Sequence, residues 1–128
     1  MSRNIKTIPT SDYDAVVATV QRYVDGMRIG SSVEIANAFH SDAIMYGLHG
    51  RNVLRDIKAL YDFVDEHGKA PEIKARVDIL AITPTTAVVR VDMEKDAIGL
   101  DYTDFHSLVK LDGKWQIIAK VFHLYESV

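Results

Sequence analysis

Asp104 and His106 are the residues of this sequence whose types and spacing best suit acid–base chemistry. They are two positions apart in an alternating segment, and side chains two apart on a β-strand project from the same face. A carboxylate beside an imidazole orients the ring and favours its protonated form, an arrangement that a general base exploits. The pair therefore predicts a proton-transferring site. Alternatively, Asp104 with His106, or Asp104 with Lys120, forms a structural ion pair without chemistry.

The composition disfavours several other classes of site. The sequence has no cysteine, which excludes disulfides, a thiol nucleophile and a cysteine–zinc site. The five histidines lack metal-ligand spacing, and there is no glycine-rich phosphate loop or nucleophile elbow, so we expect no metal and no cofactor. A net charge of −3 without a basic block argues against nucleic-acid binding.

Length and composition indicate one globular domain. The chain has 128 residues, of which 48% are hydrophobic and 26% charged. We expect a polar N-terminal extension over residues 1–11 and a single domain over residues 12–128. No apolar run approaches the roughly 18 residues of a membrane helix, and no signal core precedes the domain, so we expect a cytoplasmic protein that does not contact membranes.

Helical periodicity dominates the first half of the chain and strand periodicity the second. The predicted helices run from Ser11 or Asp12 to near Gly30, from about 32 to 39, and from about 52 to 66. The predicted strands cover about 43–48, 73–81, 87–94, 100–111 and 114–124, the last two joined by an Asp112-Gly113 hairpin turn. This order indicates an α+β fold with helices on one face of a curved antiparallel sheet.

The last hairpin has two unlike faces if its residues alternate strictly. One face carries Trp115, Ile117, Val121, Phe105, Val109 and Leu111. The other carries Asp104, His106, Lys120 and Phe122. Helices cover only one side of a sheet, so the Trp115 face needs a second cover, and we predict a homodimer through it. Burial by the N-terminal segment is the alternative.

Two motifs carry a family resemblance. The sequences FHSDA at 39–43 and YTDFHSLVKLDGKWQIIAKVF at 102–122, with the order of elements, resemble the nuclear transport factor 2-like superfamily. Within it the chain looks most like the lumazine-binding (SnoaL-like) family, over about residues 12–124. The resemblance implies a cone-shaped sheet around three N-terminal helices, open at one end and usually dimeric. This scaffold hosts isomerases, cyclases, dehydratases and binding modules, so the fold does not fix the function.

A more distant resemblance is to the steroid Δ-isomerases. The sequence VQRYV at 20–24 is similar to the isomerase helix whose tyrosine donates a hydrogen bond to the oxyanion, which implies that role for Tyr23. The protonated acid of that oxyanion hole would fall at or beside Asp104. The general base would fall near Gly47, and glycine cannot accept a proton, which argues against the isomerase mechanism.

Inside such a cone we expect a pocket for a small, partly apolar molecule. Its ligand-binding residues would be Tyr46, Lys120, Phe122 and Ile118. The leading hypothesis is a homodimeric binding protein. The alternative is a cofactor-independent isomerase, cyclase or dehydratase, with His106 as base, Asp104 orienting it and Tyr23 as donor. If His106 is buried beside Asp104, we expect its pKa to exceed that of a free histidine.

Overall fold

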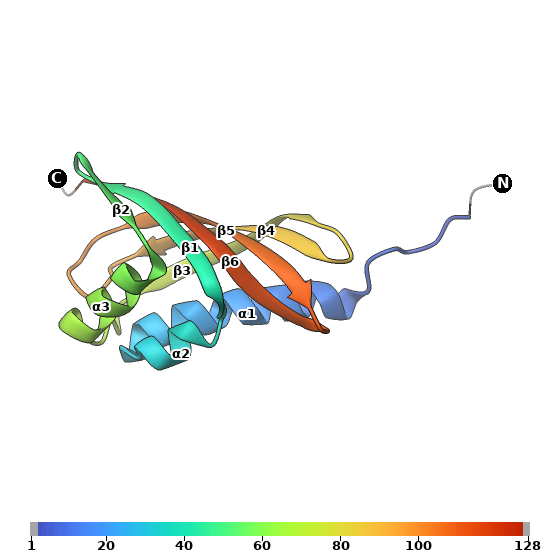
Figure 1. The fold of residues 1–128 in the computed structure, drawn as a ribbon, viewed down its shortest axis with the longest axis horizontal. Coiled ribbons are helices and arrows are strands. Elements are labelled where there is room, and N and C mark those ends of the chain that lie inside the picture. The colour runs from blue at the N-terminus through green and yellow to red at the C-terminus, as the bar shows by residue number, and fades with distance from the viewer. Residues whose placement is uncertain (1–2, 127–128) are drawn as a thin grey trace.

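Helices lie against the concave side of a curved sheet in the computed structural model, which describes residues 3–126 (Figure 1). The helices are α1 (Thr10–Ile29), α2 (Ser32–Ala36) and α3 (Ile57–His67). The strands are β1 (Phe39–His49), β2 (Asn52–Arg55), β3 (Lys74–Ile82), β4 (Thr86–Glu94), β5 (Tyr102–Leu111) and β6 (Lys114–Leu124). The predicted α+β fold is confirmed. Within residues 3–126, none of the helices combines the length and apolarity that crossing a membrane requires.

The sheet has the strand order β2-β1-β6-β5-β4-β3. Neighbouring strands are antiparallel except β1 and β6, which run parallel. The sequence order did not show this parallel pair, because a long stretch of chain separates the two strands. The pairing brings β1 next to the hairpin that carries Asp104 and His106, and so places early and late segments around one interior.

Residues 52–55, expected at the start of the third helix, form strand β2 instead. Gly50, with a φ of 62°, allows the chain to turn after β1, so that His49 faces Asn52 in the antiparallel pair. The helix begins only at Ile57, because the side chain of Asp56 caps it by accepting a hydrogen bond from the amide of Lys58. The helical period therefore starts five residues later than predicted.

The first turns of helix α1 pack against the β5–β6 hairpin. The helix begins at Thr10, after Pro9, and its buried face includes Val16, Val20 and Tyr23. Asp12, one of the two predicted starts of this helix, lies inside its first turn. Its carboxylate accepts hydrogen bonds from Lys110 Nζ at 3.0 Å and Trp115 Nε1 at 3.4 Å. The start of α1 is thereby held against the β5–β6 hairpin.

Strict alternation fails on β6, and this overturns the predicted position of Trp115. Ser107 pairs with Ala119 and Leu108 with Ile117, so Ile118 is an extra residue, a β-bulge. Before the bulge Trp115 and Ile117 point inward and are buried. After it the inward positions are Lys120 and Phe122. Trp115 and Ile117 are therefore core residues and cannot form a subunit contact.

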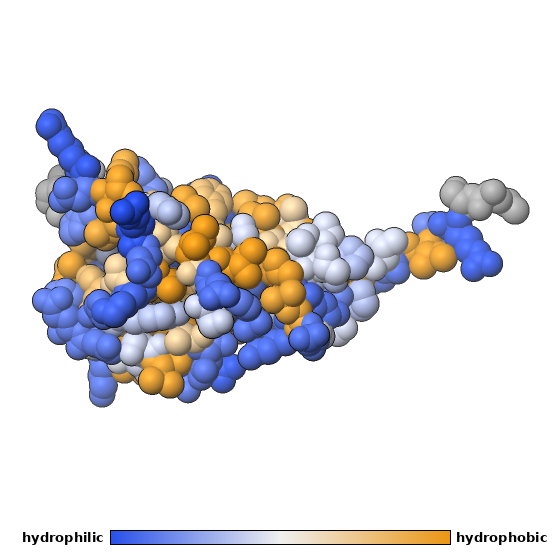
Figure 2. All heavy atoms as spheres, in the orientation of Figure 1, coloured by the Kyte–Doolittle hydropathy of each residue, from blue (hydrophilic) through white to orange (hydrophobic). Residues whose placement is uncertain are grey.

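The convex side of the sheet, called the outer face below, remains apolar without them. Exposed side chains there include Ile44, Tyr46 and Leu48 of β1, Phe105 of β5 and Val121 of β6. Figure 2 shows apolar residues gathered over β1 and β6 on the side turned to the viewer. A homodimer through the outer face remains a prediction, with Val121 and Phe105 as its candidate contacts.

Candidate functional site

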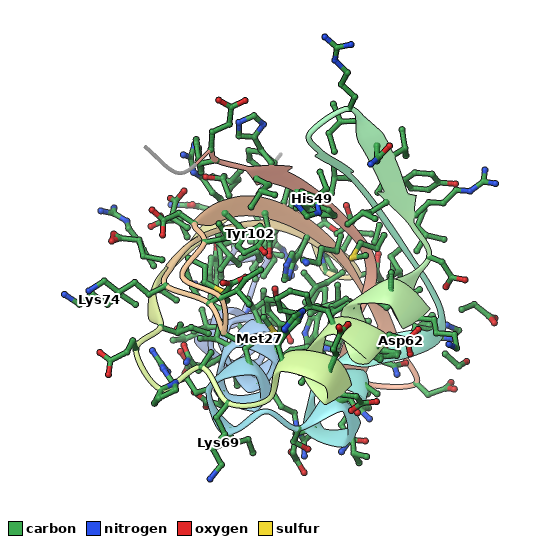
Figure 3. All side chains as sticks on the ribbon, turned by 90° about the vertical axis from the view of Figure 1, so that its left-hand side faces the viewer. Met27, His49, Asp62, Lys69, Lys74 and Tyr102 are labelled. Atoms are coloured by element: carbon green, nitrogen blue, oxygen red, sulfur yellow. The ribbon has the colours of Figure 1, made fainter. Side chains whose placement is uncertain are left out.

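A cavity opens at the wide end of the cone, between α1, α3 and the concave side of the sheet. Its volume is about 90 Å³. Met27 of α1, His49 of β1 and Tyr102 of β5 are among its lining residues, and Figure 3 shows them around the opening. Most of the lining is aliphatic or aromatic. Among the described residues that line it, Lys120 is the only lysine, arginine, aspartate or glutamate.

Three polar side chains meet at the floor of this cavity. Lys120 and Tyr23 belong to its lining, and both face Asp104. The Tyr23 hydroxyl donates a hydrogen bond to Asp104 Oδ2 at 3.2 Å, and Lys120 Nζ lies 3.9 Å from the same oxygen. Asp104 is 1% exposed and Lys120 5% exposed. The three groups form one buried, coupled cluster at the end of an apolar space.

His106 lies behind this cluster, away from the cavity. It is completely buried, and its Nε2 is 3.3 Å from Asp104 Oδ2. Its ring packs edge-on to Tyr23, with the centroids 5.2 Å apart. His106 is not among the lining residues, so a molecule in the cavity meets Lys120 and Tyr23 first. The structure therefore does not favour His106 as a base that contacts a substrate.

Burial dominates the electrostatics of the cluster. Burial lowers the pKa of His106 below its usual value, which the attraction of Asp104 only partly opposes. The expected rise in the His106 pKa is therefore wrong, because the cost of desolvating an imidazolium exceeds the gain from one carboxylate that Lys120 also faces. A neutral ring with its Nε2 proton toward Asp104 satisfies the contact.

The pKa values of Asp104, Lys120 and Tyr23 also differ from their usual values, and that of Asp104 shifts in the direction that keeps its carboxylate ionised. Burial alone would raise the pKa of Asp104, but the charge of Lys120 and the hydrogen bonds from His106 and Tyr23 outweigh it, and the pKa lies below its usual value. Burial lowers the pKa of Lys120, against the opposing effect of Asp104. Burial raises the pKa of the Tyr23 hydroxyl well above its usual value, so this group donates as a neutral phenol.

Comparison with known proteins identifies the family. A family model described as "Putative lumazine-binding" matches residues 11–123. The chain belongs to this lumazine-binding family. A relative from Cladobotryum sp, named "Aldolase FrzH", is 46% identical over 121 residues, and the match covers 94% of this chain and 97% of the relative.

Solved structures resembling this member of the lumazine-binding family confirm the nuclear transport factor 2-like superfamily. An NTF2-like protein of unknown function from Methylobacillus flagellatus KT superposes with a TM-score of 0.87 at 34% identity, covering 93% of this chain and 96% of that one. Another from Shewanella baltica OS155 has a TM-score of 0.87 at 31% identity, covering 95% and 100%. A ketosteroid isomerase-like protein from Erwinia carotovora atroseptica SCRI1043 shares the fold alone, with a TM-score of 0.68 at 14% identity and coverage of 93% and 100%.

Two residues expected to bind a ligand do not line the cavity. Tyr46 lies on the outer face and is 46% exposed, because the alternation of β1 turns its neighbours Met45 and Gly47 inward. Ile118 is the bulged residue of β6 and is only half-buried, outside the cavity wall. Lys120, Phe122 and Tyr23 lie at the cavity as predicted, while their roles in binding or catalysis stay predictions.

The loop between β4 and β5, which was not expected near the site, forms part of the cavity rim. The carboxylate of Asp96 accepts hydrogen bonds from the amides of Ile98 and Leu100, and from the Tyr102 hydroxyl at 2.6 Å. This places Ile98 and Leu100 at the cavity wall. An aspartate three residues before Gly99 is an ordinary turn signal, so the sequence indicated a turn but not its position at the cavity.

The structure also explains the absence of the isomerase-type base in this family member. Gly47 pairs with Phe122, and a Cβ at Gly47 would collide with the Phe122 ring. An aromatic side chain thus fills the space that a carboxylate at position 47 would occupy. Proton transfer in this cavity can instead use the cluster of Lys120, Asp104 and Tyr23, and His49 also lines the space.

Proposed function

We propose that this protein catalyses an aldol-type reaction in its cavity, making or breaking a carbon–carbon bond next to the carbonyl group of a small, partly apolar compound. The observation that carries the proposal is the buried cluster of Lys120, Tyr23 and Asp104 at the end of an apolar cavity. The 46% identity to a protein named an aldolase supports this reaction class over the isomerase, cyclase and dehydratase alternatives.

The cluster has the parts that such chemistry requires. A carbonyl compound that gains or loses a bond at the neighbouring carbon develops negative charge on its oxygen. The Lys120 amine is a hydrogen-bond donor that lines that space, and its effect is stronger in an interior from which water is excluded. Tyr23 also lines the space and donates its one hydroxyl proton to Asp104. Asp104 can exchange a proton directly with Tyr23, whose hydroxyl lies 3.2 Å from its Oδ2. Lys120 Nζ lies 3.9 Å from the same oxygen, so the two groups must approach each other before a proton can pass between them.

A binding protein without chemistry is the second candidate. It is favoured by the apolar lining and by the position of Asp104 and His106 outside the set of lining residues. In that case Lys120 selects a ligand with an acceptor oxygen, and Phe122 and Met27 supply shape.

A carbon-acid assay distinguishes the two candidates. Cyclohexanone is incubated with the protein in D2O, and exchange of its protons next to the carbonyl is followed by NMR; cleavage of a β-hydroxy ketone that releases a fluorescent naphthaldehyde is followed in parallel. We expect both rates to exceed those of buffer and to fall at least about tenfold in Ala59→Trp, which fills the cavity from α3.

Ala18→Trp is the matched control, because Ala18 is an exposed residue of α1 that does not line the cavity. It should leave both rates unchanged. If the ketones raise the melting temperature but neither reaction exceeds buffer, the aldol assignment is wrong and the binding protein is favoured.

A further inference from the structure

Lys120 has an unusual environment for a lysine. Its side chain is 6% exposed, and the nitrogen lies 4.9 Å from the Phe122 ring centroid and 5.4 Å from that of Tyr23. Its one hydrogen-bond partner among the described residues is the sulfur of Met45, at 3.8 Å. Asp104 Oδ2 is 3.9 Å away, well beyond the roughly 2.7–2.9 Å of a charge-assisted hydrogen bond.

Burial of Lys120 favours its neutral form, while the Asp104 carboxylate and the faces of the two aromatic rings attract the ammonium ion. An ammonium in an apolar interior is costly unless several oxygens accept its protons, and here no oxygen lies within hydrogen-bond distance among residues 3–126. A neutral amine loses little by the same burial and keeps a lone pair. Because Lys120 lines the cavity, that lone pair is available to a molecule inside it.

We propose that Nζ of Lys120 forms an imine with the carbonyl carbon of the substrate. This deepens the proposed function and rests on it. The amine nitrogen adds to the carbonyl carbon, the carbonyl oxygen takes up a proton, and a second proton transfer lets that oxygen leave as water. The protonated imine then accepts the electron pair of the carbon–carbon bond as that bond breaks: the β-hydroxyl loses its proton, its fragment leaves as an aldehyde, and an enamine remains. The enamine carbon takes up a proton, and water adds to the resulting iminium ion, which releases the ketone and restores the amine.

Asp104 and Tyr23 are placed to move the protons of these steps. Asp104 takes the proton that the nitrogen loses on forming its new bond, since Oδ2 is the nearest carboxylate oxygen. The Tyr23 hydroxyl, 3.2 Å from the same oxygen, connects that carboxylate to the cavity, where the leaving water forms. Neither residue needs to attack the substrate, so both act as proton-transfer groups beside the reactive amine.

Two other lysines have the close carboxylate partner that Lys120 lacks within the described part of the chain. Lys58 donates a hydrogen bond to Asp62 at 2.8 Å on the surface of α3, and this partner raises its pKa. Lys110 donates to Asp12 at 3.0 Å. Both have a close carboxylate partner, and that partner favours the ammonium form of Lys58. At neutral pH they should react far more slowly with a ketone.

Reductive trapping tests the imine directly. The full-length protein is incubated at neutral pH with cyclohexanone and sodium cyanoborohydride, which reduces imines to stable amines, and the adduct is located by peptide mass spectrometry. We expect a cyclohexyl group on Lys120 before any other lysine. Lys58→Arg should retain this adduct and Lys120→Arg should lack it. No adduct in the unmodified protein, or equal labelling of Lys58 and Lys120, overturns the proposal whether or not the variants fold.

Rates separate failure of the imine from failure of the aldol assignment. Lys120→Arg keeps a positive charge but cannot form an imine, and Lys120→Met approximates the length of the side chain without the charge. If both fold, as judged by melting temperature, each should lower cyclohexanone exchange at least about a hundredfold. If Lys120→Arg keeps the wild-type rate, a cation suffices and the imine is wrong, while the aldol function stands. If the adduct forms but no reaction is catalysed, the imine stands and the aldol function fails.

Discussion

His106 provides a test of the electrostatics on which the site depends. In the folded protein its imidazole is neutral, because burial lowers its pKa below the usual 6.5. Unfolding exposes the ring and restores the ordinary value. Below that value the unfolded chain binds a proton that the folded chain does not, so acidification favours unfolding. The contribution of His106 to the free energy of unfolding should therefore fall as the pH falls.

The magnitude follows from linkage. One proton bound by the unfolded state alone changes the free energy of unfolding by about 1.4 kcal/mol per pH unit. Between about pH 8 and about pH 5.5, wild type should therefore lose stability through His106, by at most about 1.4 kcal/mol. His106→Gln keeps a side-chain N–H for Asp104 but has no titrating group. Its free energy of unfolding should therefore fall less than that of wild type between the same two pH values, by the contribution of His106. Urea denaturation at both pH values measures the difference, in which the remaining histidines cancel.

His123→Gln is the matched control, because it removes an imidazole from an exposed position on the outer face and should follow wild type. The decisive observation is the sign. If wild type loses less stability than His106→Gln on acidification, Asp104 holds a protonated imidazole in the fold, as the sequence alone predicted. The assignment of burial as the stronger effect would then be wrong.

Three further substitutions test the packing and the assembly. Trp115→Ala removes a buried indole that donates to Asp12, and should lower the free energy of unfolding in urea by about 3–5 kcal/mol; a loss under about 1 kcal/mol would contradict burial beneath α1. Val121→Arg puts a charge on the exposed outer face, so a dimer formed there should sediment as a monomer that keeps its melting temperature, whereas an intact dimer would refute that interface. Gly47→Ala drives a methyl group into the Phe122 ring and should cost about 1–3 kcal/mol, and adding Phe122→Leu should recover part of it; strictly additive losses would show that the two positions do not touch.

Periodicity predicted the site correctly wherever the local backbone was regular. Asp104 and His106 both point inward on β5 because the burial of that strand alternates from Asp104 to Leu108. Tyr23 lies on the buried face of α1 because the helix keeps its period to Ile29. These are local regularities, which a sequence displays directly.

The features that the sequence predicted wrongly depend on contacts between distant parts of the chain. Tyr46 is an aromatic residue with a polar end, a type that often lines pockets. Whether it faces the cavity or the outer face depends on the parallel pairing of β1 with β6. The pKa of His106 depends on how much water the whole fold removes from the ring, and the spacing of Asp104 and His106 shows only the opposing charge. Neither the face on which Tyr46 lies nor the pKa of His106 can be predicted from the few residues around each position.

The bulge at Ile118 shows why one irregularity decides both the core and the site. With strict alternation along β6, Trp115 and Lys120 lie on opposite faces, so a strand that buries the indole would turn the amine outward. The extra residue shifts the alternation by one, so Trp115 can pack beneath α1 while Lys120 and Phe122 reach the cavity. In the sequence, the bulge is indicated by two adjacent apolar residues, Ile117 and Ile118. The inward-facing positions are odd-numbered before them and even-numbered after them. Deleting Ile118 should therefore remove the amine from the cavity or the indole from the core, and no single register of β6 can retain both.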